Sequence, residues 1–145
     1  MRVAGSYTLD APREQIWPLI HNPTYLVSLI PGCEKLEQVS LTEYRGQMQI
    51  WLPAVAGRYE VYVRLLEEDE PYRRRFLGEV DGPAGSIRGD AAFALQTTGD
   101  KTALEYEAQG TVSGLLARLS ERFVEGAARG LVNQGLVKLN QGLNR

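Results

Sequence analysis

Few side chains in this sequence are suited to acid–base, nucleophilic or metal chemistry. There is one histidine, His21, and one cysteine, Cys33. A single histidine cannot build a multi-histidine metal site, and a single cysteine can form neither an internal disulfide nor a thiolate metal site. We interpret His21 as a surface or helix-capping residue beside Asn22, and Cys33 as a buried, inert thiol with no activating base nearby in sequence. We therefore expect neither a metal nor a cofactor.

The one credible acid–base set is Tyr59, Arg74 and Tyr106. Strand alternation places all three on the same face of the predicted sheet, where they could donate protons and orient a substrate. No carboxylate can be assigned to that face. Packing of the tyrosines, with each hydroxyl bonded to a neighbour, is favoured over catalysis. The triplet 73–75 is interpreted as mainly solvated rather than as an anion site. We therefore predict no catalytic residues and no enzymatic activity.

Length and charge limit the remaining functions. The chain has 145 residues and a net charge of −2, which predicts one domain over residues 1–145 without a basic face for nucleic acid. No apolar run is long enough to span a bilayer, and the N-terminus does not resemble a signal peptide, so we expect a cytoplasmic protein. Trp17 and Trp51 fit packing, exposure or a docking surface equally well.

The N-terminal third combines one strand with two short helices. Residues 3–9 alternate as in a half-buried strand. Asp10 is predicted to cap the first helix, with Pro12 in its first turn. Asn22 is predicted to cap the second helix, which ends at Pro31.

The middle of the chain predicts six further strands joined by short turns. Such an order is typical of an antiparallel meander with one apolar face. The predicted strands cover residues 34–41, 43–52, 58–68, 72–80, 85–97 and 102–112.

A long helix over Gly114 to Asn144 is predicted to cover the apolar face of the sheet. Its apolar residues recur at helical spacing and no proline interrupts it. Gly126 and Gly130 are costly inside a helix, by about 1 kcal/mol each. They indicate either close approach of the helix to the sheet or room for a guest molecule.

This order of elements resembles the helix-grip fold of the START-like (SRPBCC) superfamily, and within it the carbon monoxide dehydrogenase G-subunit (CoxG-like) family. The resemblance is carried by residues 30–36 (IPGCEKL), the Gly82–Ser86 turn with Gly89, residues 104–108 (LEYEA) and Gly126–Ala128. It implies an α+β fold, in which a curved antiparallel seven-stranded sheet wraps a long C-terminal helix and two short helices follow the first strand.

The resemblance also implies a function. Members of the family are similar to accessory proteins of molybdenum-dependent carbon monoxide dehydrogenases, which help the enzyme to mature or to meet the membrane. Some members carry a C-terminal extension that could anchor them to a membrane. This sequence ends at Arg145, so independent anchoring is not expected.

The leading hypothesis is non-enzymatic binding or carrying of a hydrophobic small molecule, lipid or quinone-like, between the sheet and the last helix. The partner implied by the resemblance is a molybdenum hydroxylase such as carbon monoxide dehydrogenase, with peripheral contact at the inner membrane as a further possibility. Two alternatives stay open: an assembly or membrane-docking factor acting by protein–protein contact, and a polyketide-cyclase-like enzyme. The candidate ligand-binding residues are Leu26, Leu29, Met48, Ile50, Tyr59, Val61, Val63, Phe76, Phe93, Tyr106, Leu119, Phe123, Gly126, Ala127 and Gly130.

Overall fold

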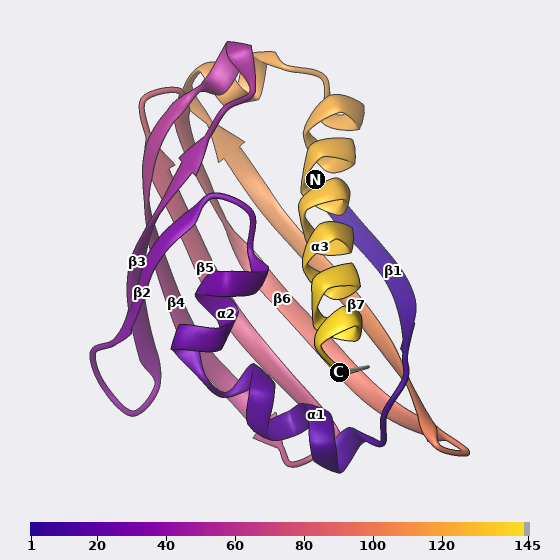
Figure 1. Ribbon diagram of the computed structural model, residues 1–145. Coiled ribbons are helices and arrows are strands. Elements are labelled where there is room, and N and C mark those ends of the chain that lie inside the picture. Colours follow the sequence, from indigo (N-terminus) through magenta and orange to yellow (C-terminus); the bar gives the residue numbers. More distant parts are fainter. Residues whose placement is uncertain (144–145) are drawn as a thin grey trace.

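The protein is a curved sheet wrapped around one long helix, as the computed structural model shows for residues 1–143 (Figure 1). The elements follow the predicted order. They are β1 (Arg2–Leu9), α1 (Arg13–Ile20), α2 (Pro23–Leu29), β2 (Cys33–Gln38), β3 (Glu43–Ile50), the 3-10 helix η1 (Pro53–Val55), β4 (Gly57–Asp69), β5 (Arg73–Gly82), β6 (Gly85–Thr98), β7 (Lys101–Ser113), the 3-10 helix η2 (Gly114–Arg118) and α3 (Glu121–Leu143).

All strands belong to one antiparallel seven-stranded sheet, in the order β1-β7-β6-β5-β4-β3-β2. Strands β2 to β7 form a meander, and β1 closes the far edge by pairing with β7. In Figure 1, α3 crosses one face of the sheet while α1 and α2 lie at its lower end. The predicted helix-grip α+β fold is confirmed.

The two short helices differ in how they begin. Asn22 caps α2 as predicted, because its side-chain oxygen accepts hydrogen bonds from the backbone N–H groups of Thr24 and Tyr25. The prediction that Asp10 caps α1 is wrong. Pro12 is the N-cap residue and no side chain caps this helix, since Asp10 lies too far upstream. Asp10 instead forms an ion pair with Lys101 at 3.3 Å.

The last helix starts later than the sequence predicted. Residues Gly114–Arg118 form η2, Leu119 is extended, and α3 begins at Glu121. The side chain of Ser120 accepts a hydrogen bond from the N–H of Phe123, which caps the new helix. The first seven residues of the predicted helix are therefore wrong, because helical periodicity continued through a segment that bends. Asn144 lies outside the described residues.

The apolar interior is divided into two clusters at opposite ends of the sheet. The lower cluster, under α1 and α2, consists of Leu9, Ala11, Ile16, Trp17, Ile20, Leu29, Leu95, Leu104 and Leu139. The upper cluster, beside η1 and η2, consists of Val55, Tyr59, Ala84 and Leu116.

Between the two clusters the inner face of the sheet is incompletely covered. Val61, Val63, Phe76 and Gly78 point to this face and are only half-buried. Helix α3 packs mainly on β1 and α2, so it covers one side of the sheet better than the other. Within residues 1–143, no helix is long and apolar enough to cross a bilayer.

Candidate functional site

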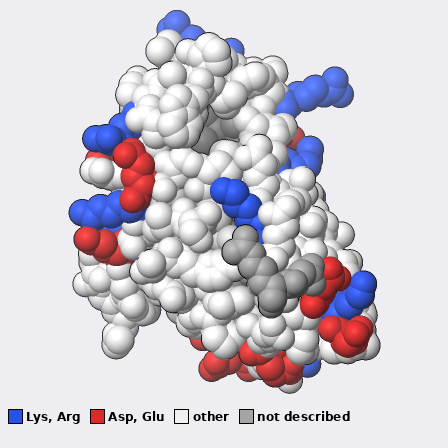
Figure 2. All heavy atoms as spheres, in the orientation of Figure 1, with Lys and Arg blue, Asp and Glu red and all other residues white. Residues whose placement is uncertain are grey.

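A groove of about 450 Å³ lies between the end of β3, η1 and the middle of α3. Figure 2 shows a hollow in this part of the surface, surrounded mainly by uncharged residues. Most of its lining is apolar, which is typical of sites for apolar small molecules. The lining residues are Pro31, Met48, Gln49, Ile50, Trp51, Leu52, Pro53, Ala127, Gly130, Leu131 and Gln134.

The glycines of α3 separate the two interpretations that the sequence left open. A methyl group added at Gly130 would meet nothing within 4 Å, so the helix backbone does not approach the sheet there. Gly130 instead lines the groove. Gly126 also has open space around it, but it is exposed. The close approach occurs at Gly135, where an added methyl group would lie 3.4 Å from the backbone oxygen of Leu29.

The predicted ligand-binding residues are spread over several regions rather than gathered in one site. Met48, Ile50, Ala127 and Gly130 line the groove, while Val61, Val63 and Phe76 continue along the half-buried inner face. Leu26, Leu29, Phe93 and Tyr106 belong to or pack on the lower cluster, and Tyr59 and Leu119 on the upper one. Phe123 and Gly126 are exposed.

Sequence reasoning missed the lip of the groove. The sequence predicted only the end of a strand and a turn at Trp51, Leu52 and Pro53, yet these residues line one wall. Trp51 lies at the surface, since the residue is 71% exposed. An apolar run within a turn was the available signal, since turns are usually rich in polar residues and glycine.

Tyr59, Arg74 and Tyr106 do not come together as a catalytic set. Tyr59 pairs with Met48, whereas Arg74 pairs with Glu68. Tyr59 and Glu68 are nine positions apart on β4, a separation of about 30 Å along a strand. Tyr59 is 1% exposed and its hydroxyl donates to the backbone oxygen of Val55 at 2.7 Å, as in the packing alternative.

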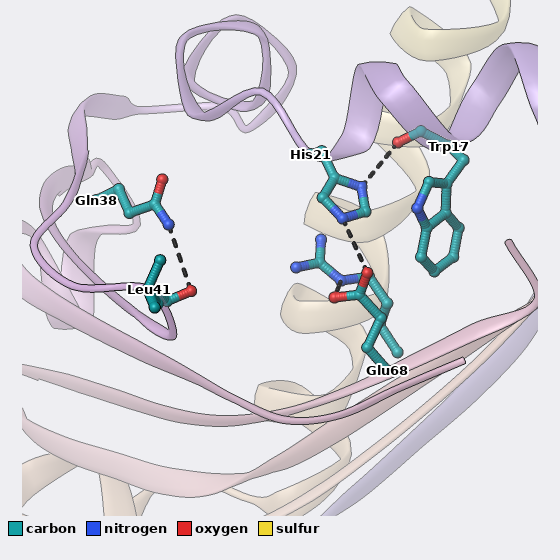
Figure 3. A network of polar contacts seen from close by, with 6 residues as sticks. Trp17, His21, Gln38, Leu41 and Glu68 are labelled. Carbon is teal, nitrogen blue, oxygen red and sulfur yellow. Dashed lines mark hydrogen bonds and ion pairs between the residues drawn. The ribbon is translucent and has the colours of Figure 1, made fainter. Parts of the chain in front are cut away.

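A cluster of polar residues lies on the inner face of the sheet, at the end far from the groove. Arg74 is 4% exposed, and its Nε lies 3.5 Å from Oε2 of Glu68 in an ion pair. The other oxygen of Glu68 lies 3.2 Å from Nε2 of His21, whose Nδ1 is 3.0 Å from the backbone oxygen of Trp17 (Figure 3). We call Trp17, His21, Glu68 and Arg74 the polar cluster. The prediction of a mainly solvated arginine triplet is wrong for Arg74.

Glu68 reaches the inner face because of a β-bulge. In β4, Leu65 pairs with Phe76 but Glu67 pairs with Arg75, so Leu66 is an extra residue. One extra residue reverses the alternation of every side chain beyond it. Strict alternation assigned Glu68 to the outer face, and for this reason no carboxylate was expected near Arg74.

The single cysteine and the two tryptophans have distinct surroundings. Partial burial raises the pKa of the Cys33 thiol above its usual value, which agrees with an inert thiol. Trp17 is 3% exposed and packs in the lower cluster, in contrast to the exposed Trp51.

Among residues 1–143, no group of three or more histidine, cysteine or acidic side chains is arranged to hold a metal ion.

Comparison with known proteins gives a family and a set of similar folds. The sequence model of the family described as the G subunit of carbon monoxide dehydrogenase (CoxG) matches residues 5–144. No curated protein matches the sequence.

Several solved structures resemble the whole chain. A conserved protein from Geobacillus kaustophilus has a TM-score of 0.94 at 25% identity, with 99% of this chain and 95% of that one covered. A START superfamily protein from Mycobacterium smegmatis has a TM-score of 0.73 at 13% identity, with 97% and 94% covered. A protein from Chromobacterium violaceum has a TM-score of 0.73 at 16% identity, with 97% and 95% covered.

Proposed function

Because the chain belongs to the carbon monoxide dehydrogenase CoxG family, we propose that it binds and carries a hydrophobic small molecule without transforming it. The ligand is lipid or quinone-like, and it occupies the groove between β3, η1 and α3. The protein acts in this role as an accessory protein of a molybdenum-dependent carbon monoxide dehydrogenase.

The observation that carries this proposal is the apolar groove and the incompletely covered sheet beside it. Gly130 leaves open space on α3, and Val61 and Val63 are half-buried on the facing sheet. Removing 100 Å² of apolar ligand surface from water contributes about 2.5 kcal/mol, so an extended hydrocarbon can bind without a charged contact. Tyr59 on β4 is nine positions away from Glu68, the residue that pairs with Arg74 on β5, and this separation argues against the cyclase alternative.

The second candidate function is docking to a partner through the lip of the groove. Trp51 is 71% exposed and Leu52 is 39% exposed, side by side in the chain. Aromatic residues of this kind are enriched at the centres of protein interfaces. A docking surface at the opening of the groove is compatible with handing a ligand to the enzyme or to a membrane.

Organic-solvent extraction of the purified protein, followed by mass spectrometry, tests the carrier role. We expect one class of apolar molecule in near-stoichiometric amount, and we expect delipidated protein to bind N-phenyl-1-naphthylamine with increased fluorescence. If there is neither an extracted lipid nor probe binding, the carrier role is refuted. Failure of purified carbon monoxide dehydrogenase to form a complex would refute the partnership alone.

A further inference from the structure

The inner face of the sheet links the groove to the polar cluster. From Tyr59 near the groove, β4 continues through Val61 and Val63, whose partners on β5 are Val80 and Gly78. These residues are half-buried, and a methyl group added at Gly78 would meet nothing within 4 Å. This row of inner-face residues ends about 30 Å from Tyr59 along the strand, where Glu68 pairs with Arg74.

The polar cluster contains hydrogen-bond donors that are buried and lack acceptors. Trp17 is 3% exposed, and its indole Nε1 has no hydrogen-bond partner among residues 1–143. The same holds for Nε of Arg74, since its contact with Glu68 is an ion pair rather than an aligned hydrogen bond. Figure 3 shows the indole nitrogen of Trp17 on the side of the ring that faces His21 and Glu68. Buried donors are normally satisfied, so these two call for an acceptor.

Aromatic rings surround these donors on the sheet side. The guanidinium of Arg74 lies 4.9 Å from the ring centre of Phe76, which in turn lies 6.1 Å from that of Phe93. The ring of Phe93 lies 6.3 Å from that of Trp17. The cluster therefore combines two donors with an apolar wall, which suits the junction between a polar end and a hydrocarbon chain.

We propose that the polar cluster binds the polar end of the carried molecule, through a carbonyl or carboxylate oxygen that accepts hydrogen bonds from Trp17 Nε1 and Arg74. Glu68 holds the guanidinium of Arg74 through their ion pair. As a carboxylate, Glu68 only accepts hydrogen bonds, so it does not replace either donor to the ligand oxygen. The apolar remainder of the ligand extends along Val61 and Val63 toward the groove. This proposal rests on the proposed function and specifies the orientation and chemical class of its ligand.

Nuclear magnetic resonance of the ¹⁵N-labelled wild-type protein tests the proposal. The chain has two tryptophans, so two indole N–H signals are expected, and the Trp17→Phe variant assigns them. Delipidated protein is titrated with 2-tridecanone, dodecanoate and tridecane, which share the hydrocarbon but differ in the acceptor. We expect the ketone or the carboxylate, and not the alkane, to move the Trp17 indole proton downfield, as a new hydrogen bond does.

The outcomes distinguish failure of the polar-end site from failure of the carrier role. If tridecane moves only Trp51, while ketone and dodecanoate leave Trp17 unmoved, the polar-end site is refuted and the carrier role stands. If no compound moves either signal, both proposals fail. A shift of Trp17 by the ketone alone identifies a neutral carbonyl, and a larger shift by dodecanoate identifies an anionic ligand.

Affinities give an independent measurement. The Trp17→Phe change keeps an apolar ring and removes the N–H, so the dissociation constant of the acceptor ligand should rise about tenfold while that of tridecane is unchanged. Trp51→Phe is the matched control, because Trp51 lines the groove about 30 Å from the polar cluster and should leave the ratio of the two dissociation constants unchanged. Equal weakening of both ligands by Trp17→Phe would contradict the hydrogen bond.

Discussion

Replacing Gly130 with leucine separates the stability of α3 from the use of the groove. An interior glycine costs a helix about 1 kcal/mol relative to alanine, and leucine is nearly as favourable as alanine. A Cβ at Gly130 would meet nothing within 4 Å, so the new side chain causes no clash at its base. We expect the free energy of unfolding to rise by about 0.8 kcal/mol and the melting temperature by about 3 °C.

The same substitution should weaken ligand binding. Leucine adds four side-chain carbons at a position that lines a groove of about 450 Å³. If each added carbon excludes one CH₂ group of the ligand, the loss is about 3 kcal/mol, or roughly a hundredfold in affinity. Thermal unfolding by circular dichroism and titration with N-phenyl-1-naphthylamine measure the two effects.

Gly126→Leu is the matched control within the same helix. Gly126 is exposed and also has nothing within 4 Å of an added Cβ. It should give the same stabilisation and leave probe affinity unchanged. A lower melting temperature for Gly130→Leu would refute the prediction, because the space beside this residue would then be filled. Equal weakening of probe binding by the two variants would refute it as well.

Three further predictions concern the lip of the groove, the polar cluster and the thiol. Trp51→Ala should change the free energy of unfolding by less than about 0.5 kcal/mol but weaken probe binding at least about fivefold, whereas Leu41→Ala, at a residue 91% exposed, should change neither. Glu68→Gln should lower the free energy of unfolding in urea by about 2 kcal/mol, because it leaves the buried Arg74 without a counter-ion; an unchanged urea midpoint would contradict the ion pair. Burial raises the pKa of the Cys33 thiol in the folded protein above its value in the unfolded chain. The contribution of this thiol to the free energy of unfolding is therefore complete below the unfolded pKa and is lost as the pH rises through the folded pKa. Iodoacetamide should therefore label Cys33 more slowly in native than in urea-unfolded protein at about pH 8, and equal rates would argue against burial.

The strands and the overall fold could be predicted because their determinants are local. Alternating apolar residues indicated the seven strands, and Asn22 followed by Pro23 indicated the start of α2. The beginning of α3 could not be predicted in the same way. Apolar residues on both sides of Ser120 keep a helical spacing, so this spacing does not show where α3 begins. In the structure the start of α3 is marked by the hydrogen bond from the N–H of Phe123 to the side chain of Ser120.

Part of the candidate site could also be predicted from local patterns. Met48 and Gly130 were assigned from alternation and from the cost of a glycine inside a helix, and both line the groove. The exposed wall at Trp51 was missed because a turn has no periodicity that shows which way its side chains point. Glu68 was missed because the extra residue Leu66 reverses the alternation that was used to place it.

The sequence by itself determined the order of the elements and, up to the β-bulge in β4, the apolar face of the strands, since these follow from spacing along a single segment. Tertiary structure decided where α3 lies over the sheet, and therefore that Gly130 borders open space while Gly135 touches α2. It also decided that Arg74, Glu68, His21 and Trp17 meet, because their contacts join α1, β4 and β5 across long stretches of chain. Such contacts depend on strand register and helix position, which no local pattern encodes.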